Sequence, residues 1–209
     1  MSTLPSPRLG REVGRYRGSG RSELWSRAMT DPSDDEALTD EARIEEPRSD
    51  ATDPAEAAFE LWEEAQKYHL GGDLERAIDL YDRSIEIHPT AEAHTFRGWA
   101  YSFMGRIDEA IEECHRAIDV DPTFGNPYND IGSYLMKLGR LDEAPPWFEK
   151  AKRADRYEPR HFPYMNLARL YASKGQIARA IDELEGALAH APGEPSCQML
   201  HSQLSRMLN

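Results

Sequence analysis

Small and bulky apolar side chains recur along the chain at fixed distances from four glycines, Gly72, Gly105, Gly139 and Gly175. A small residue stands seven positions before each glycine, a bulky one four positions before it, and an alanine five positions after it. The small residues and alanines are Ala65, Gly98, Gly132, Ala168, Ala77, Ala110, Ala144 and Ala180. Self-similarity with a period of about 34 residues is typical of helical repeat proteins.

Each unit is predicted to contain two helices joined by a glycine turn, because apolar residues recur at steps of three and four on both sides of the glycine. One such hairpin cannot bury its own apolar face. The pattern therefore predicts an all-α fold, a right-handed superhelical solenoid of four repeats spanning about 58–90, 91–124, 125–160 and 161–194. In the third repeat, Pro145 and Pro146 fall early in the second helix, which is expected to begin late.

The last residues, 195–209, are predicted to form a capping helix. They place four apolar side chains on one helical face: Cys197, Leu200, Leu204 and Leu208. A terminal repeat needs such a cover for its apolar side.

This pattern resembles the tetratricopeptide repeat. The segments WAYSFMGRIDEAIEECHRAIDVDP and NDIGSYLMKLGRLDEA carry the resemblance. It implies a scaffold whose first helices line a concave groove for a peptide or helical segment of another protein. Carried over position by position, it implies a peptide-binding groove of Trp62, Gln66, His69, Trp99, Phe103, Asn129, Ser133, Asn166 and Arg169. Trp62 and Trp99 have a second interpretation as packing residues, since large aromatic side chains are mostly buried.

Two extra residues between the third and fourth repeats lie in the stretch RADRYEPRHFPY. Insertions in repeat proteins often map to the working face, so this junction loop supplies further candidate contacts with a partner: Tyr157, Arg160, His161 and Tyr164. The alternative is that its aromatic side chains only fill a widened gap between repeats.

The net charge of −13 over 209 residues is unevenly distributed. Residues 1–28 carry six arginines against two glutamates, and residues 29–56 carry eleven acids against two arginines. The remaining −8 belongs to residues 57–209, and such a field disfavours nucleic acid as the ligand of the folded part.

Residues 1–54 lack apolar periodicity and are predicted to be a disordered tail, basic over 1–28 and acidic over 29–54. Residues 55–209 then form the repeat domain. The basic segment has three interpretations: an arm for RNA or an anionic surface, a solvated tail, or a segment that is lost when translation starts at Met29.

Local signatures of catalysis and metal binding are missing from the sequence. It contains no GxGxxG, GxxxxGK[ST], GxSxG or HExxH motif, and no two of its seven histidines lie three or four positions apart. Cys114 and Cys197 form no CxxC pair, and no stretch approaches the roughly 18 apolar residues of a membrane span. The sequence predicts a cytoplasmic protein that is not an enzyme and uses no metal or cofactor.

The function predicted from the sequence is therefore protein binding, as an adaptor, scaffold or chaperone-like protein that is monomeric when empty. Two alternatives stay open: a self-associating assembly scaffold, and a regulatory subunit of a larger complex.

Overall fold

A computed structural model describes residues 53–208, so the predicted disordered tail lies outside the described residues except for its last two positions. Within this range the chain forms nine helices and no strand, and the all-α prediction is confirmed. The first four are α2 (Pro54–Leu70), α3 (Leu74–Ile87), α4 (Ala91–Phe103) and α5 (Ile107–Val120). The next four are α6 (Asn126–Lys137), α7 (Pro145–Arg153), α8 (Phe162–Ser173) and α9 (Ile177–His190), and α10 (Pro195–Leu208) follows. None of these helices is long and apolar enough to cross a membrane.

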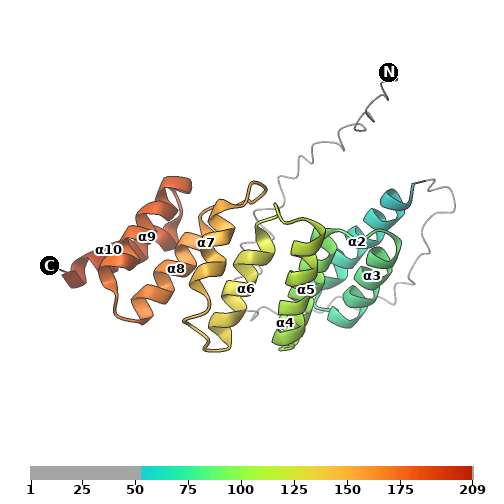
Figure 1. The fold of residues 1–209 in the computed structure, drawn as a ribbon, viewed down its shortest axis with the longest axis horizontal. Helices are drawn as coiled ribbons and strands as arrows, with labels where there is room; N and C mark the ends of the chain where they lie inside the picture. The colour runs from blue at the N-terminus through green and yellow to red at the C-terminus, as the bar shows by residue number, and fades with distance from the viewer. Residues whose placement is uncertain (1–52, 209) are drawn as a thin grey trace, which may run out of the picture. The chain divides into compact units, whose positions relative to one another are not determined.

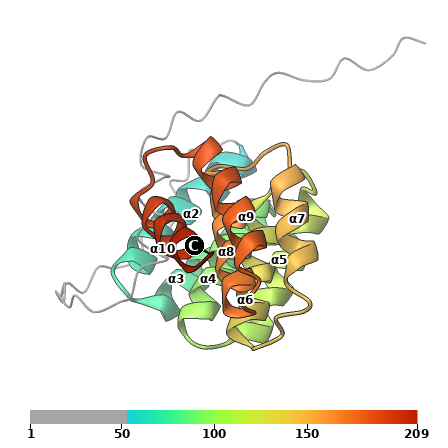
Figure 2. The same cartoon turned by 90° about the vertical axis from the view of Figure 1, so that its left-hand side faces the viewer.

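The helices pack as four antiparallel pairs, α2 with α3, α4 with α5, α6 with α7 and α8 with α9. Each second helix also contacts the first helix of the next pair, so the pairs succeed one another in chain order (Figure 1). The first helices α2, α4, α6 and α8 contact one another in sequence as well. Viewed from the end, the pairs lie behind one another (Figure 2). This stacking is the predicted solenoid.

The four glycines that set the period are the turns between paired helices, as predicted. Their φ angles are 83°, 78°, 74° and 70°, a region of backbone conformation that residues with a side chain rarely adopt. The small residues beside them allow close packing. In the third pair, for example, a Cβ atom added at Gly132 would lie 2.7 Å from the ring of Phe148.

The second helix of the third repeat begins late, as the two prolines predict. The helices α3, α5 and α9 start two residues after their turn glycine, whereas α7 starts at Pro145, six residues after Gly139. The reason is that proline lacks the N–H that a helix interior needs but is tolerated in the first turn.

The predicted capping helix is confirmed as α10, which packs on α9. Cys197 and Leu204 are buried against the stack, and Leu200 is half-buried. On the other side of α10, Met199 and Met207 are exposed.

The junction between the third and fourth repeats is built around Arg156, which pairs with the loop after α5 in an isolated parallel bridge to Phe124. Its N–H donates to Thr123 O (3.0 Å) and its carbonyl accepts from Gly125 N (2.9 Å). Its guanidinium binds the carboxylates of Glu92 and Asp121, each at 2.6 Å. One side chain thus connects the two ends of the second repeat to the far end of the third.

Arg156→Pro is expected to destabilise the protein by about 1–3 kcal/mol, although the other three repeats carry proline at this position. Proline has no N–H to donate to Thr123 O, and its side chain cannot form the two ion pairs of Arg156. Arg156→Ala, which keeps the backbone bonds, should cost less because the side chain is about half exposed. Urea unfolding of both variants tests this, and an Arg156→Pro protein as stable as the wild type would contradict it.

Candidate functional site

The candidate site is the surface made by the first helices of the four pairs, α2, α4, α6 and α8, which we call the first-helix face. Each repeat places the same positions there, because the first helices lie side by side along the stack. The nine residues that the family resemblance implies for a groove all lie on these helices. Their side chains differ strongly in solvent exposure.

Both tryptophans of this set are buried in an aromatic row. The Trp62 ring lies 5.5 Å from that of Phe59 and 5.3 Å from that of Phe96, and Phe96 lies 4.7 Å from Trp99. Trp62 and Trp99 are buried. Their burial favours the packing interpretation that the sequence left open, and their role as anchors for a partner stays a prediction.

Trp99 also makes a polar contact inside the stack. Its indole N–H donates to Asp130 Oδ2 across 2.6 Å, which links α4 to α6. Asp130 is buried, and burial raises its pKa to about 7, although the bond from Trp99 opposes this rise. A carboxyl of this kind is half protonated near neutral pH.

Helices α2 and α4 each end in an exposed apolar side chain, Leu70 (61% exposed) and Phe103 (42% exposed), and we call these two residues the apolar ledge. His69 supports it: its ring packs edge-on against Phe103 at 5.6 Å, and its Nδ1 lies 3.3 Å from the Tyr81 hydroxyl. Burial lowers the pKa of His69 to about 4. The His69 ring is therefore neutral at physiological pH.

A polar cluster joins α6 to α8 on the same face. Asn166 Nδ2 donates to Asn129 Oδ1 (3.0 Å) and lies 3.3 Å from Ser133 Oγ. Asn129 and Asn166 are buried and Ser133 is half-buried, whereas Arg169, one turn further along α8, is exposed. Gln66 on α2 is half-buried. The predicted set thus divides into a packed part and a part that is exposed to solvent.

The junction-loop candidates divide in the same way. Tyr157 is buried, with its Cβ 2.4 Å from where a Cβ at Gly125 would stand. This burial favours the alternative that Tyr157 fills the gap between repeats, and its contact with a partner stays a prediction. Arg160, His161 and Tyr164 are half-buried. Arg160 donates to Asp155 O (2.9 Å), and the Tyr164 ring packs at 5.2 Å from that of His190.

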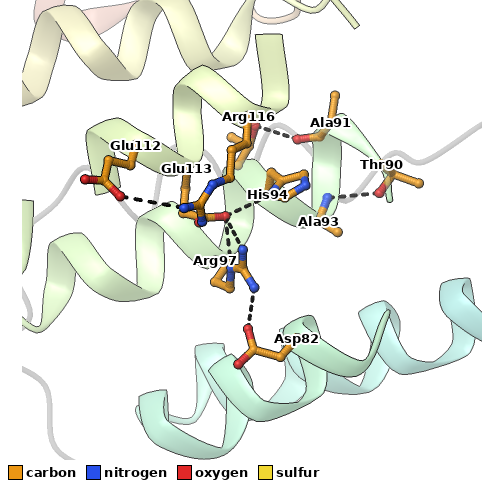
Figure 3. Close-up of polar contacts among 10 residues, drawn as sticks. Asp82, Thr90, Ala91, Ala93, His94, Arg97, Glu112, Glu113 and Arg116 are labelled. Atoms are coloured by element: carbon orange, nitrogen blue, oxygen red, sulfur yellow. Dashed lines mark hydrogen bonds and ion pairs between the residues drawn. The ribbon is translucent and has the colours of Figure 1, made fainter. Parts of the chain in front are cut away.

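A buried ion cluster ties the first two pairs together (Figure 3). Glu113 on α5 accepts from Arg97 Nε (2.9 Å) and Nη2 (2.7 Å), lies 2.8 Å from His94 Nδ1 and pairs with Arg116. Arg97 also pairs with Asp82 on α3. Burial opposes ionisation of Glu113, yet the bonds from His94 and Arg97 lower its pKa. Because both His94 and Glu113 are buried, the cluster fixes helices rather than offering groups to a ligand.

Sequence reasoning missed three residues of the first-helix face: Leu70, Lys137 and Asp130. The first two share a repeat position with Phe103, two residues before the turn glycine, so the repeat register alone identifies them. Asp130 carries no such signal, because its burial depends on contacts across pairs.

Over residues 53–208, no group of three or more His, Cys, Asp or Glu side chains is placed to hold a metal ion. The buried carboxylates described above are bound by indole, guanidinium and imidazole groups.

The sequence profile of the tetratricopeptide repeat matches the chain three times, over residues 91–124, 126–157 and 163–192. Among curated proteins, the chain is 32% identical over 99 residues to small glutamine-rich tetratricopeptide repeat-containing protein 2 of Mycosarcoma maydis, which is 47% of this chain and 28% of that protein. It is 27% identical over 85 residues to heat shock protein STI1 of Saccharomyces cerevisiae, which is 40% of this chain and 14% of STI1. The matches to these relatives span a minor part of their length.

Among solved structures, PilF of Pseudomonas aeruginosa superposes with a TM-score of 0.67 at 23% identity, covering 72% of this chain and 68% of PilF. PilW, a type IV pilus biogenesis factor, superposes with a TM-score of 0.61 at 24% identity, covering 71% of each chain. These similarities concern the fold.

Proposed function

The chain is a tetratricopeptide repeat protein, and from this we propose that it is a non-enzymatic adaptor that binds a segment of another protein along its first-helix face. Protein binding is the general role that its relatives support. The particular face, the kind of segment and the monomeric state are our proposal.

The observation that carries the proposal is the exposed part of the first-helix face. Leu70 and Phe103 present apolar surface at the ends of two neighbouring helices, and Arg169 presents a charge on a third. Clustered exposed apolar side chains beside polar groups are typical of protein-binding surfaces. The aromatic row from Phe59 to Trp99, in which the two tryptophans are buried, packs α2 against α4.

Phe103→Ala is expected to weaken partner binding at least tenfold, because an aromatic side chain at the centre of an interface contributes about 2 kcal/mol or more. Val120→Ala is the matched control: Val120 is 43% exposed against 42% for Phe103, but it ends a second helix, α5. Quantitative affinity capture with both variants, followed by mass spectrometry, identifies proteins lost with Phe103→Ala and kept with Val120→Ala. Equal capture by both variants would contradict the proposal.

The mass of the protein in solution distinguishes the adaptor from a self-associating scaffold. The adaptor is expected to elute as a monomer of 23.8 kDa in light scattering at micromolar concentration. A dimer that Phe103→Ala dissociates would instead place a second copy on the first-helix face.

A further inference from the structure

Helix α2 carries two exposed glutamates on the same side as its end of the apolar ledge. Glu63 and Glu56 stand seven and fourteen positions before Leu70, close to whole numbers of helical turns, so the three share one side of the helix. Phe59 and Gln66 continue this stripe at steps of three and four and are half-buried. Acidic and apolar side chains therefore alternate along one side of α2.

The two glutamates lack a bound counter-charge in the part of the chain that the structure describes. Neither Glu56 nor Glu63 forms an ion pair with a residue of 53–208, and Lys67, one turn after Glu63, binds neither of them. On the neighbouring helix α4, Arg97 is held by the buried ion cluster. Both carboxylates are thus available to a cation that a partner brings.

The aromatic row beside these glutamates gives independent evidence for a partner. Trp62, which precedes Glu63, is 8% exposed, and its buried indole Nε1 has no hydrogen-bond partner within residues 53–208. Buried donors in folded proteins are seldom unpaired. The rings of Phe59 and Phe96 on either side of Trp62 are half-buried, and Phe103 is exposed. Aromatic faces attract the cations of lysine and arginine, so rings and carboxylates favour the same kind of ligand.

We infer that the segment bound on the first-helix face is basic where it crosses α2 and α4: it places a lysine or arginine on Glu63 and packs an apolar side chain on the apolar ledge. This inference rests on the proposed function and adds the chemistry of the partner. Lysine and arginine suit such a surface, because their aliphatic stems cover apolar groups while their charged ends reach a carboxylate. The net charge of −8 over residues 57–209 attracts a basic segment over longer distances.

The test selects peptides of about 12 residues from a random displayed library against the full chain and measures their affinity by fluorescence anisotropy. Selected peptides are expected to be enriched in lysine or arginine together with an apolar residue. Their affinity should fall about tenfold with Glu63→Lys, because the substitution replaces an attraction by a repulsion. Changing the basic residue of the peptide to glutamate should restore binding to Glu63→Lys.

Glu86→Lys is the matched control for the change in net charge. Glu86 is an exposed glutamate in the last turn of α3, a second helix, and it forms no ion pair with any residue of 53–208. Its substitution changes the long-range field of the protein by the same amount as Glu63→Lys, and it should leave the peptide affinity within about twofold of the wild type. Because both glutamates are exposed, both variants should melt like the wild type, which melting curves verify.

The outcomes separate the two proposals. Peptides that lose affinity with Phe103→Ala but bind Glu63→Lys as they bind the wild type would overturn the basic partner and leave the adaptor function standing. Selected peptides without lysine or arginine would do the same, as would equal losses with Glu63→Lys and Glu86→Lys. A library that yields no peptide sensitive to Phe103→Ala would overturn both proposals.

Discussion

Trp99→Ala is expected to lower the free energy of unfolding by about 3–5 kcal/mol, the cost of removing a large aromatic side chain from a packed interior. Trp99 is 7% exposed, packs on Phe96 at 4.7 Å and donates to Asp130. The substitution therefore leaves a cavity between α4 and α6 and deprives a buried carboxyl of its donor.

Two further variants separate the cavity from the lost hydrogen bond. Trp99→Phe keeps most of the ring and removes the indole N–H, so it should cost about 1–2 kcal/mol. Phe103→Ala removes an exposed aromatic side chain from the same helix and should change stability much less. Urea unfolding followed by circular dichroism measures all three. If Trp99→Ala unfolded at the same urea concentration as the wild type, Trp99 would be an anchor for a partner rather than a packing residue.

The repeat architecture could be predicted from the sequence because it depends on local periodicity. The four turn glycines, the small residues around them and Pro145 each specify backbone geometry within their own unit. The capping helix followed from one apolar stripe. None of these predictions required knowledge of how successive units face one another.

The division of the candidate site into packed and exposed residues could not be predicted in this way. Trp99 and Phe103 lie four positions apart on one helix, yet one is buried and the other is exposed. The difference arises because Trp99 points to Asp130 of the next pair, a contact between residues 31 positions apart. Tyr157 is buried for a similar reason, since Gly125 leaves room for its side chain. Such contacts depend on the packing of whole helices rather than on spacing along one of them.

The buried Asp130 and the half-buried His69 are expected to give the stability of this protein opposing dependences on pH. The pKa of Asp130 is about 7 in the folded protein and 3.8 in an unfolded chain. The folded protein therefore holds the Asp130 proton more tightly than the unfolded chain does. The free energy of unfolding has its full contribution from protonated Asp130 below pH 4, and this contribution is lost as pH rises to 7. The pKa of His69 is about 4 when folded and 6.5 when unfolded, so its contribution is complete above pH 6.5 and is lost as pH falls to 4.

The surroundings of Asp130 explain why its ionisation is unfavourable. Trp99 on α4 is its hydrogen-bond donor, and the neighbouring titratable groups are Cys114 on α5, Tyr134 on α6 and Tyr157 in the junction loop, which are uncharged at neutral pH. The one cation that acts on it is Lys137, which is exposed. A carboxylate formed here lacks a buried counter-charge, and its cost appears as lost stability.

Asp130→Asn is therefore expected to be as stable as the wild type near pH 4 and more stable at pH 7, by up to about 4 kcal/mol, since each pH unit between the two pKa values corresponds to about 1.4 kcal/mol. Asparagine keeps an acceptor for Trp99 and has no charge to bury. His69→Phe should act oppositely, gaining up to about 3 kcal/mol relative to the wild type as pH falls from 6.5 to 4. Urea unfolding at half-unit steps from pH 4 to 8 measures both differences, with Asp142→Asn as the control for an exposed acid. A stability difference between Asp130→Asn and the wild type that stays constant over this range would show that Asp130 ionises normally in the folded protein.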